Sequence, residues 1–191
     1  LIADEITTGI GRAGKFFYSD SFSVKPDILC FGKAISAGHY PVAATLFNDK
    51  IIDAWYTLEQ QGVPYSKIHR RGNSITGTQE GCALGLKVLE ILERDNLIQQ
   101  VNERGKYALE KLKKIENYSS VREIRGTGLL IGIDIISSDF AKNTVTLEMR
   151  KRGINVLPEG RVIMFNPAYI ISEDQIDNFV NTLSKVLKIN E

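Results

Sequence analysis

The sequence contains few residues of the kinds that form disulfides or hold structural metals. It has two cysteines, Cys30 and Cys82, and two histidines among 191 residues. Both cysteines lie in apolar stretches, which indicates small buried side chains rather than a disulfide and favours a reducing, cytoplasmic compartment. The strictly apolar runs are only a few residues long, so we expect no membrane span.

The sequence also lacks an excess of charge of either sign. Lysine and arginine number 24, aspartate and glutamate number 23, and the formal net charge is +1. Recognition of a phosphate backbone relies on a basic surplus, so nucleic acid is not an expected partner. With 43% hydrophobic residues, the composition is that of a globular protein with one large domain or two small ones.

Short apolar runs alternate with helical patterns along the sequence. Strands are expected at 1–6, 28–31, 42–47, 129–136, 154–157 and 162–165. Helices are expected at 50–58, 79–94, 98–115, 139–152 and from Ser172 onward. This alternation predicts an α/β fold. A change of pattern near residue 95 predicts one domain at 1–95 and a second at 96–191.

Two of these helices carry explicit packing and capping signals. In the helix expected at 79–94, one face carries the apolar residues Cys82, Leu86, Leu89 and Leu92. The small residues Gly81, Ala83 and Gly85 leave this helix thin enough to pack closely on another element. At the start of the last helix, Ser172 and Gln175 have the spacing of a capping box.

The glycine-rich segment Gly9–Gly14 matches the pattern of a dinucleotide site and nearly matches a P-loop ending at Lys15. A dinucleotide site needs a helix to open at the loop, and the residues that follow show no helical periodicity. A P-loop needs Ser or Thr where Phe16 stands. A glycine-rich loop near a ligand or a subunit contact is the better interpretation.

An acid and a lysine stand at the ends of two expected strands. Asp4 lies near the end of the first strand, and Lys33 follows the second. Ligands of open α/β sheets collect at the carboxyl ends of strands, so both side chains could enter one crevice. Pyridoxal phosphate needs such a pair: an amine for its Schiff base and a carboxylate at its pyridine nitrogen. The alternative is that Asp4 caps a loop and Lys33 is solvated.

The residues around Asp4 and Lys33 resemble those of a known family. The segments LIADEITTGIGRAGKFF and KPDILCFGKAISAG resemble the class III (subgroup II, omega-type) aminotransferases of fold type I. Weaker matches are Arg125–Leu129 and Asn166–Ile171. The resemblance implies the C-terminal part of a large mixed or parallel-sheet α/β domain, followed by a small α+β C-terminal domain. It also implies pyridoxal 5′-phosphate as the cofactor.

The resemblance implies a role for each matching residue. Lys33 would be the catalytic residue that forms the Schiff base and moves a proton, and Asp4 would bind the pyridinium nitrogen. Ile6 would pack on one face of the ring, or be an ordinary strand residue. Thr7 stands where the family often has a glutamine that reaches the ring hydroxyl oxygen.

The resemblance further implies a homodimer whose active site is shared between subunits. Ser74 matches the position of a family threonine that reaches the cofactor phosphate of the neighbouring subunit, and Thr76 competes with it for this role. The alternative for Ser74 is a helix cap.

The substrates implied are an amine or amino-acid donor and a carbonyl or 2-oxo-acid acceptor. Arg161 could clamp a substrate carboxylate or be a surface charge. The segments around Asp4 and Lys33 are close in sequence to those of the biotin-pathway diaminopelargonate aminotransferases. Leu157, however, stands where those enzymes place an arginine. A related aminomutase or racemase is a second alternative. The chains of this family are roughly twice as long. A third alternative is therefore that this chain is a truncated, inactive fragment or a binding module. We expect no transamination from this chain alone.

Overall fold

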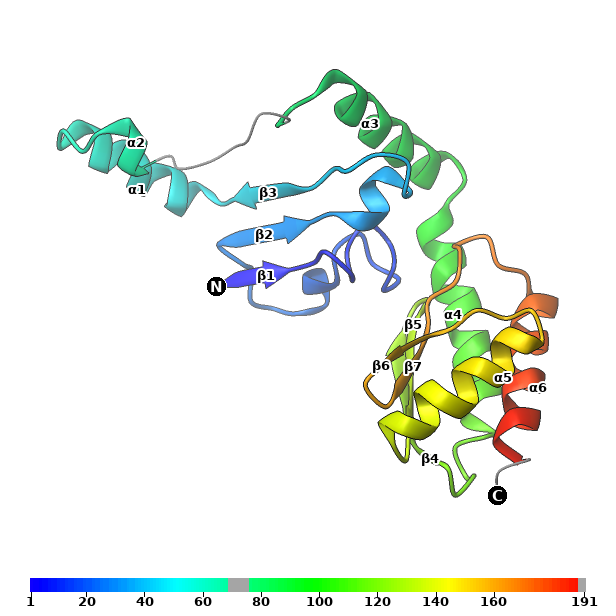
Figure 1. Ribbon diagram of the computed structural model, residues 1–191. Coiled ribbons are helices and arrows are strands. Elements are labelled where there is room, and N and C mark those ends of the chain that lie inside the picture. Colours follow the sequence, from blue (N-terminus) through cyan, green and yellow to red (C-terminus); the bar gives the residue numbers. More distant parts are fainter. Residues whose placement is uncertain (69–75, 189–191) are drawn as a thin grey trace. The chain divides into compact units, whose positions relative to one another are not determined.

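The computed structural model describes residues 1–68 and 76–188 (Figure 1). The chain forms two compact units, the first comprising Leu1–Gly11 and Lys15–Asp95. The second comprises Arg12–Gly14 and Asn96–Glu191, so a three-residue piece of the glycine-rich loop belongs to the second unit. No helix within the described residues is long and apolar enough to cross a lipid bilayer.

The first unit is built on a three-stranded sheet in the order β1-β2-β3. The strands are β1 (Ile2–Asp4), β2 (Ile28–Phe31) and β3 (Ala44–Phe47). Strands β1 and β2 are parallel, whereas β2 and β3 are antiparallel, so the sheet is mixed. The helices are α1 (Asp49–Gln60), α2 (Tyr65–Ile68) and α3 (Gln79–Arg94), with 3₁₀ turns at Tyr18–Ser21 and Lys33–Ser36. The helix expected at 79–94 is confirmed in its bounds.

The predicted close packing of α3 through its glycines is present, whereas its predicted apolar face is only partly buried. Gly81, Gly85 and Leu92 are buried, whereas Cys82 is exposed and Leu86 is 69% exposed. An added Cβ on Gly85 would lie 3.7 Å from the side chain of Ile35. Helix α3 therefore uses its glycine face to approach the 3₁₀ turn at Lys33–Ser36. The expectation that Cys82 is buried was wrong, although both cysteines are unpaired as predicted.

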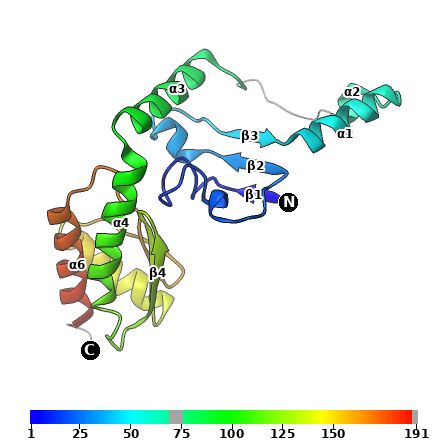
Figure 2. The same cartoon turned by 180° about the vertical axis from the view of Figure 1, so that it is seen from behind.

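The second unit contains a four-stranded antiparallel sheet in the order β4-β5-β7-β6. Figure 2 labels the first strand of this order, β4. Its strands are β4 (Val121–Thr127), β5 (Leu130–Ile135), β6 (Leu157–Glu159) and β7 (Val162–Phe165). Its helices are α4 (Leu97–Lys113), α5 (Thr146–Lys151), preceded by a π-helical turn at Phe140–Val145, and α6 (Glu173–Lys188). Strand β4 was not expected, and the strand expected at 154–157 lies later, at Leu157–Glu159.

The main hydrophobic core lies in this second unit. Helix α4 packs on β4 and α6, burying Val101, Ala108 and Leu112. At the start of α6, the Ser172 amide donates to Gln175 Oε1 at 3.0 Å. The Gln175 amide donates in return to Ser172 Oγ at 3.2 Å. The capping box is therefore confirmed, and it fixes where α6 begins.

Candidate active site

The parallel pairing of β1 and β2 sets the frame of the candidate site. Asp4, the last residue of β1, is the register partner of Cys30 in β2. The next residue, Glu5, donates its amide to the Cys30 carbonyl oxygen at 2.7 Å. Lys33 follows β2 after Gly32. The acid and the lysine thus both stand at the carboxyl ends of neighbouring parallel strands, where ligands of α/β sheets bind.

The Asp4 carboxylate is available at this edge. Its side chain is exposed, and Oδ1 accepts a hydrogen bond from the Ile6 amide at 3.1 Å. That bond orients the carboxylate without neutralising it. Ile6 is itself 38% exposed, so an apolar surface lies next to the acid along the chain.

Lys33 adopts a backbone conformation that L-residues avoid. Its φ is +43°, in the left-handed region, and it begins the 3₁₀ turn at Lys33–Ser36. Such strain costs on the order of 1–3 kcal/mol and is concentrated at functional sites. The side chain is exposed, and Nζ donates a hydrogen bond to Thr7 Oγ1 at 2.6 Å. The structure thus brings two of the predicted site residues, Lys33 and Thr7, together.

The turn that carries Thr7 is closed by the main chain. The Gly9 amide donates to the carbonyl oxygen of Glu5 at 2.9 Å. A Cβ at residue 9 would lie 2.7 Å from that same oxygen, so only glycine fits there. The glycine-rich loop opens no helix at residues 9–17. Its first glycine shapes the turn beside the candidate site.

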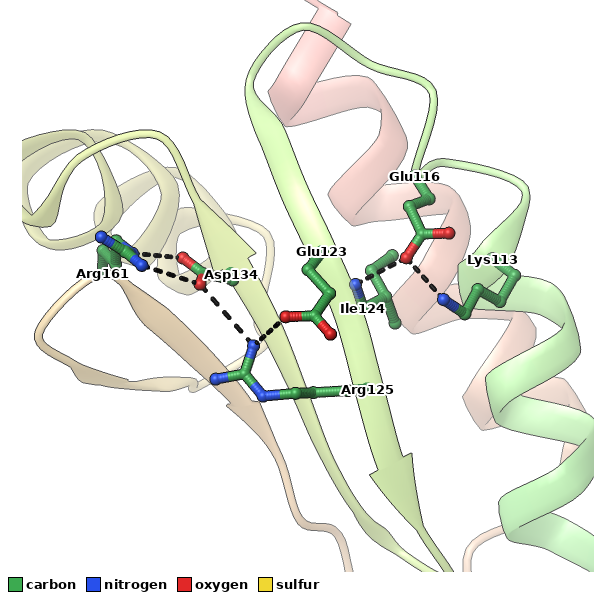
Figure 3. Close-up of polar contacts among 7 residues, drawn as sticks. All are labelled: Lys113, Glu116, Glu123, Ile124, Arg125, Asp134 and Arg161. Carbon is green, nitrogen blue, oxygen red and sulfur yellow. Dashed lines mark hydrogen bonds and ion pairs between the residues drawn. The ribbon is translucent and has the colours of Figure 1, made fainter.

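Arg161 has a structural partner in the second unit (Figure 3). Its Nε and Nη2 contact Asp134 Oδ1 and Oδ2 at 2.6 and 3.2 Å. Asp134 is buried in β5, and the hydrogen bond from Arg161 holds the pKa of its carboxyl below the ordinary value. The guanidinium fork of Arg161 already binds a carboxylate of the same sheet. This geometry favours a structural role for Arg161, which neither the substrate clamp nor the free surface charge described.

Of the two candidates for the phosphate contact, the structure describes only Thr76. Ser74 lies outside the described residues. Thr76 is described, and it is exposed in the turn ahead of α3. The N-cap residue of α3 is Thr78.

The groups at the β1–β2 edge fit the cofactor that the sequence suggested. They comprise a lysine amine, an aspartate carboxylate and an apolar side chain, from Lys33, Asp4 and Ile6, all of them exposed. A pyridoxal ring requires an amine to bind covalently, an acid for its nitrogen and apolar contact for its face. The donor set and its exposure therefore match this group.

Comparison with known proteins gives the family. The chain belongs to the class III aminotransferases, since the family model described as "Aminotransferase class-III" matches residues 1–187. The adenosylmethionine-8-amino-7-oxononanoate aminotransferase of Methanocaldococcus jannaschii is 32% identical over 202 residues, covering 98% of this chain and 43% of the relative. The gamma aminobutyrate transaminase 3, chloroplastic, of Solanum lycopersicum is 32% identical over 201 residues, covering 100% and 38%.

The solved structures give the same fold. The crystal structure of the M. jannaschii enzyme has a TM-score of 0.88 at 32% identity, covering 98% of this chain and 45% of that chain. The fold is therefore that of the fold type I aminotransferases. This chain spans less than half the length of these relatives.

Proposed function

We propose that this chain carries the catalytic lysine of a pyridoxal 5′-phosphate-dependent transaminase. The reaction moves an amino group from an amine or amino-acid donor to a carbonyl or 2-oxo-acid acceptor. The observation that carries the proposal is the strained, exposed Lys33 at the end of β2, beside the parallel strand that ends at Asp4. Membership of the class III family supports it.

Each residue at the edge has a distinct task in this proposal. When bound, the cofactor supplies an electron sink for the bond broken at the substrate α-carbon. The Lys33 amine holds the cofactor covalently and then carries a proton at Nζ. The Asp4 carboxylate keeps a proton on the ring nitrogen, and Ile6 covers one ring face. The Thr7 hydroxyl accepts a hydrogen bond from Lys33 Nζ. This favours a role in which Thr7 contacts the lysine rather than the ring hydroxyl oxygen of the cofactor.

The proposal includes a homodimer with a shared active site. Ser74 and Thr76 are the candidate hydroxyls that reach the cofactor phosphate of the partner copy. Separate Ser74→Ala and Thr76→Val variants identify which one acts, because loss of that hydroxyl weakens cofactor retention. Two free cysteines also suit a reducing, cytoplasmic location.

The amino donor and acceptor are left as chemical classes. Diaminopelargonate aminotransferase activity is the second candidate, favoured by the name and 32% identity of the M. jannaschii relative. The tomato gamma aminobutyrate transaminase is equally identical, so identity alone does not select one substrate. Leu157, which is 63% exposed in β6, stands where the biotin-pathway enzymes place an arginine, and this weighs against the second candidate.

The test is to locate the cofactor on the chain. The full chain is incubated with pyridoxal phosphate, reduced with borohydride and mapped by peptide mass spectrometry. We expect the label on Lys33, and its loss in Lys33→Arg but not in Lys25→Arg, an exposed control lysine. We expect no amino transfer from this chain alone, so an amine-donor screen with pyruvate and 2-oxoglutarate reads it in a protein that joins this chain to the remaining length of its relatives. Full turnover in Lys33→Ala, or isomerised product without net amino transfer, would contradict the proposal.

A further inference from the structure

Glu5 is a buried carboxylate that the proposed mechanism does not use. It directly follows Asp4 and is 3% exposed. Burial alone raises the pKa of Glu5, but hydrogen bonds led by the Thr8 hydroxyl and the backbone of Ser19 outweigh it and hold the pKa below the ordinary value. Glu5 is thus an ionised side chain kept inside the protein by neutral donors. Burying a charge is costly, so the donors that hold the Glu5 carboxylate must be well placed.

The contacts of Glu5 join three segments of the first unit. Thr8 Oγ1 donates to Glu5 Oε2, and the Ser19 amide donates to Oε1 at 2.5 Å. The main chain of Glu5 bonds to Cys30 on one side and to Gly9 on the other, at 2.7 and 2.9 Å. One residue therefore fixes β2, the turn from Glu5 to Gly9, and the 3₁₀ turn that contains Ser19.

The turn held in this way carries the partner of the lysine. Because Thr7 is exposed, the conformation of the turn determines where its hydroxyl lies. This hydroxyl accepts a hydrogen bond from the Lys33 amine at 2.6 Å. We infer that Glu5 is a positioning residue: by fixing the turn, its carboxylate holds the Thr7 hydroxyl against the Lys33 amine. The inference rests on the proposed function in taking Lys33 as the reactive amine.

This contact matters because an exposed lysine samples many conformations. Its four-carbon stem gives the ammonium group wide freedom, and a single fixed acceptor removes much of it. The Thr7 hydroxyl thus determines the position of the Lys33 amine. A carboxylate deep in the turn is suited to holding that acceptor, since hydrogen bonds to a charged group are stronger than neutral ones.

The test reads Lys33 directly, without cofactor or turnover. The full chain is labelled with trinitrobenzenesulfonate, and peptide mass spectrometry gives the labelling rate of Lys33 relative to Lys25. Thr7→Val removes the acceptor, and we expect the ratio to rise about fivefold, the equivalent of one hydrogen bond. Thr8→Val loosens Glu5 and should raise the ratio in the same direction, whereas the matched control Thr8→Ser should leave it unchanged.

Substitution of Glu5 itself supplies the rescue. Glu5→Leu removes both acceptors and should raise the ratio as Thr7→Val does. Glu5→Gln keeps an oxygen for the Ser19 amide and an amide for the Thr8 hydroxyl, so it should restore most of the wild-type ratio. If Glu5→Leu fails to fold, Thr8→Val decides.

A double variant separates positioning from general stabilisation. If Glu5 acts through Thr7, Thr7→Val with Thr8→Val labels no faster than Thr7→Val alone. A further rise in the double variant, or a lowered melting temperature in Thr8→Val with an unchanged ratio, would overturn the inference. These outcomes are distinct from a failure of the proposed function, which is read from borohydride fixation of the cofactor on Lys33.

Discussion

The guanidinium group of Arg12 lies over the ring of Tyr169, with its Cζ 4.5 Å from the ring centroid. Arg12 Nη1 also donates to the carbonyl oxygens of Pro167 and Leu129, at 2.5 and 3.3 Å. Burial lowers the pKa of Arg12 and raises the pKa of Tyr169. These contacts explain why Arg12–Gly14 belongs to the second unit.

Removing the Arg12 guanidinium should destabilise the second unit. Arg12→Met keeps an unbranched stem but leaves the carbonyl oxygens of Pro167 and Leu129 without this donor. We expect a loss of about 1–3 kcal/mol in the free energy of unfolding, the usual cost of unpaired buried polar groups. Urea unfolding measures it, and Lys15→Met, at an exposed position, is the control. Equal stability of Arg12→Met and wild type would contradict this assignment.

The helices that the sequence predicted best are those whose burial follows a period. In α4, the buried residues recur at intervals of three and four, and α4 begins within one residue of the expected start. These residues are Leu97, Val101, Gly105, Ala108 and Leu112. In α3 the predicted packing through Gly81 and Gly85 is present, whereas the apolar residues Cys82 and Leu86 are exposed. A helical period identifies the faces of a helix, but it does not decide which of two neighbouring faces is in contact.

The candidate site was predictable only in part, for a related reason. Asp4 and Lys33 stand at strand ends, where topology alone marks them. Glu5 lies next to Asp4, but acids are rarely buried, so no general rule selects it. The available signal was Thr8, a hydroxyl three residues after Glu5. The place of Arg12 depends on carbonyl oxygens far along the chain, which no local pattern reports.

The ion pair of Asp134 and Arg161 should contribute stability that depends on pH (Figure 3). The pKa of Asp134 is lowered in the folded chain, chiefly by the hydrogen bond from Arg161. A carboxyl whose folded pKa lies below its unfolded value of about 3.9 stabilises the fold above that value. The contribution is lost as the pH falls through the folded pKa.

Asp134→Asn tests this sign. The melting temperature of the variant should lie below that of wild type by the same margin at pH 7 and pH 5. The margin should shrink below about pH 4. Arg161→Gln should show the same pattern. Arg125 lies farther from Asp134, at 3.6 Å, so Arg125→Gln should have the smaller effect. A margin that is constant down to pH 3 would exclude the pair as its source.

The capping box of α6 gives a local test. Ser172→Ala removes the acceptor for the Gln175 amide, and we expect a loss of about 1 kcal/mol in the free energy of unfolding. Ser172→Thr, which keeps the hydroxyl, should lose less. Thermal or urea unfolding reads both variants. A Ser172→Ala variant as stable as Ser172→Thr would show that the cap adds nothing.

Gly105 in α4 should reverse the usual effect of glycine in a helix. Replacing a helical glycine with alanine normally stabilises by about 0.5–1 kcal/mol. Here an added Cβ would lie 2.2 Å from the carbonyl oxygen of Gly128, which is rigid backbone in the β4–β5 turn. Gly105→Ala should therefore destabilise by about 1–3 kcal/mol, as overpacking does. Lys106→Ala, on the exposed side of the same helix, should change stability by only a few tenths of a kcal/mol. Urea unfolding compares the two, and a gain of stability in Gly105→Ala would refute the close packing of α4 on this turn.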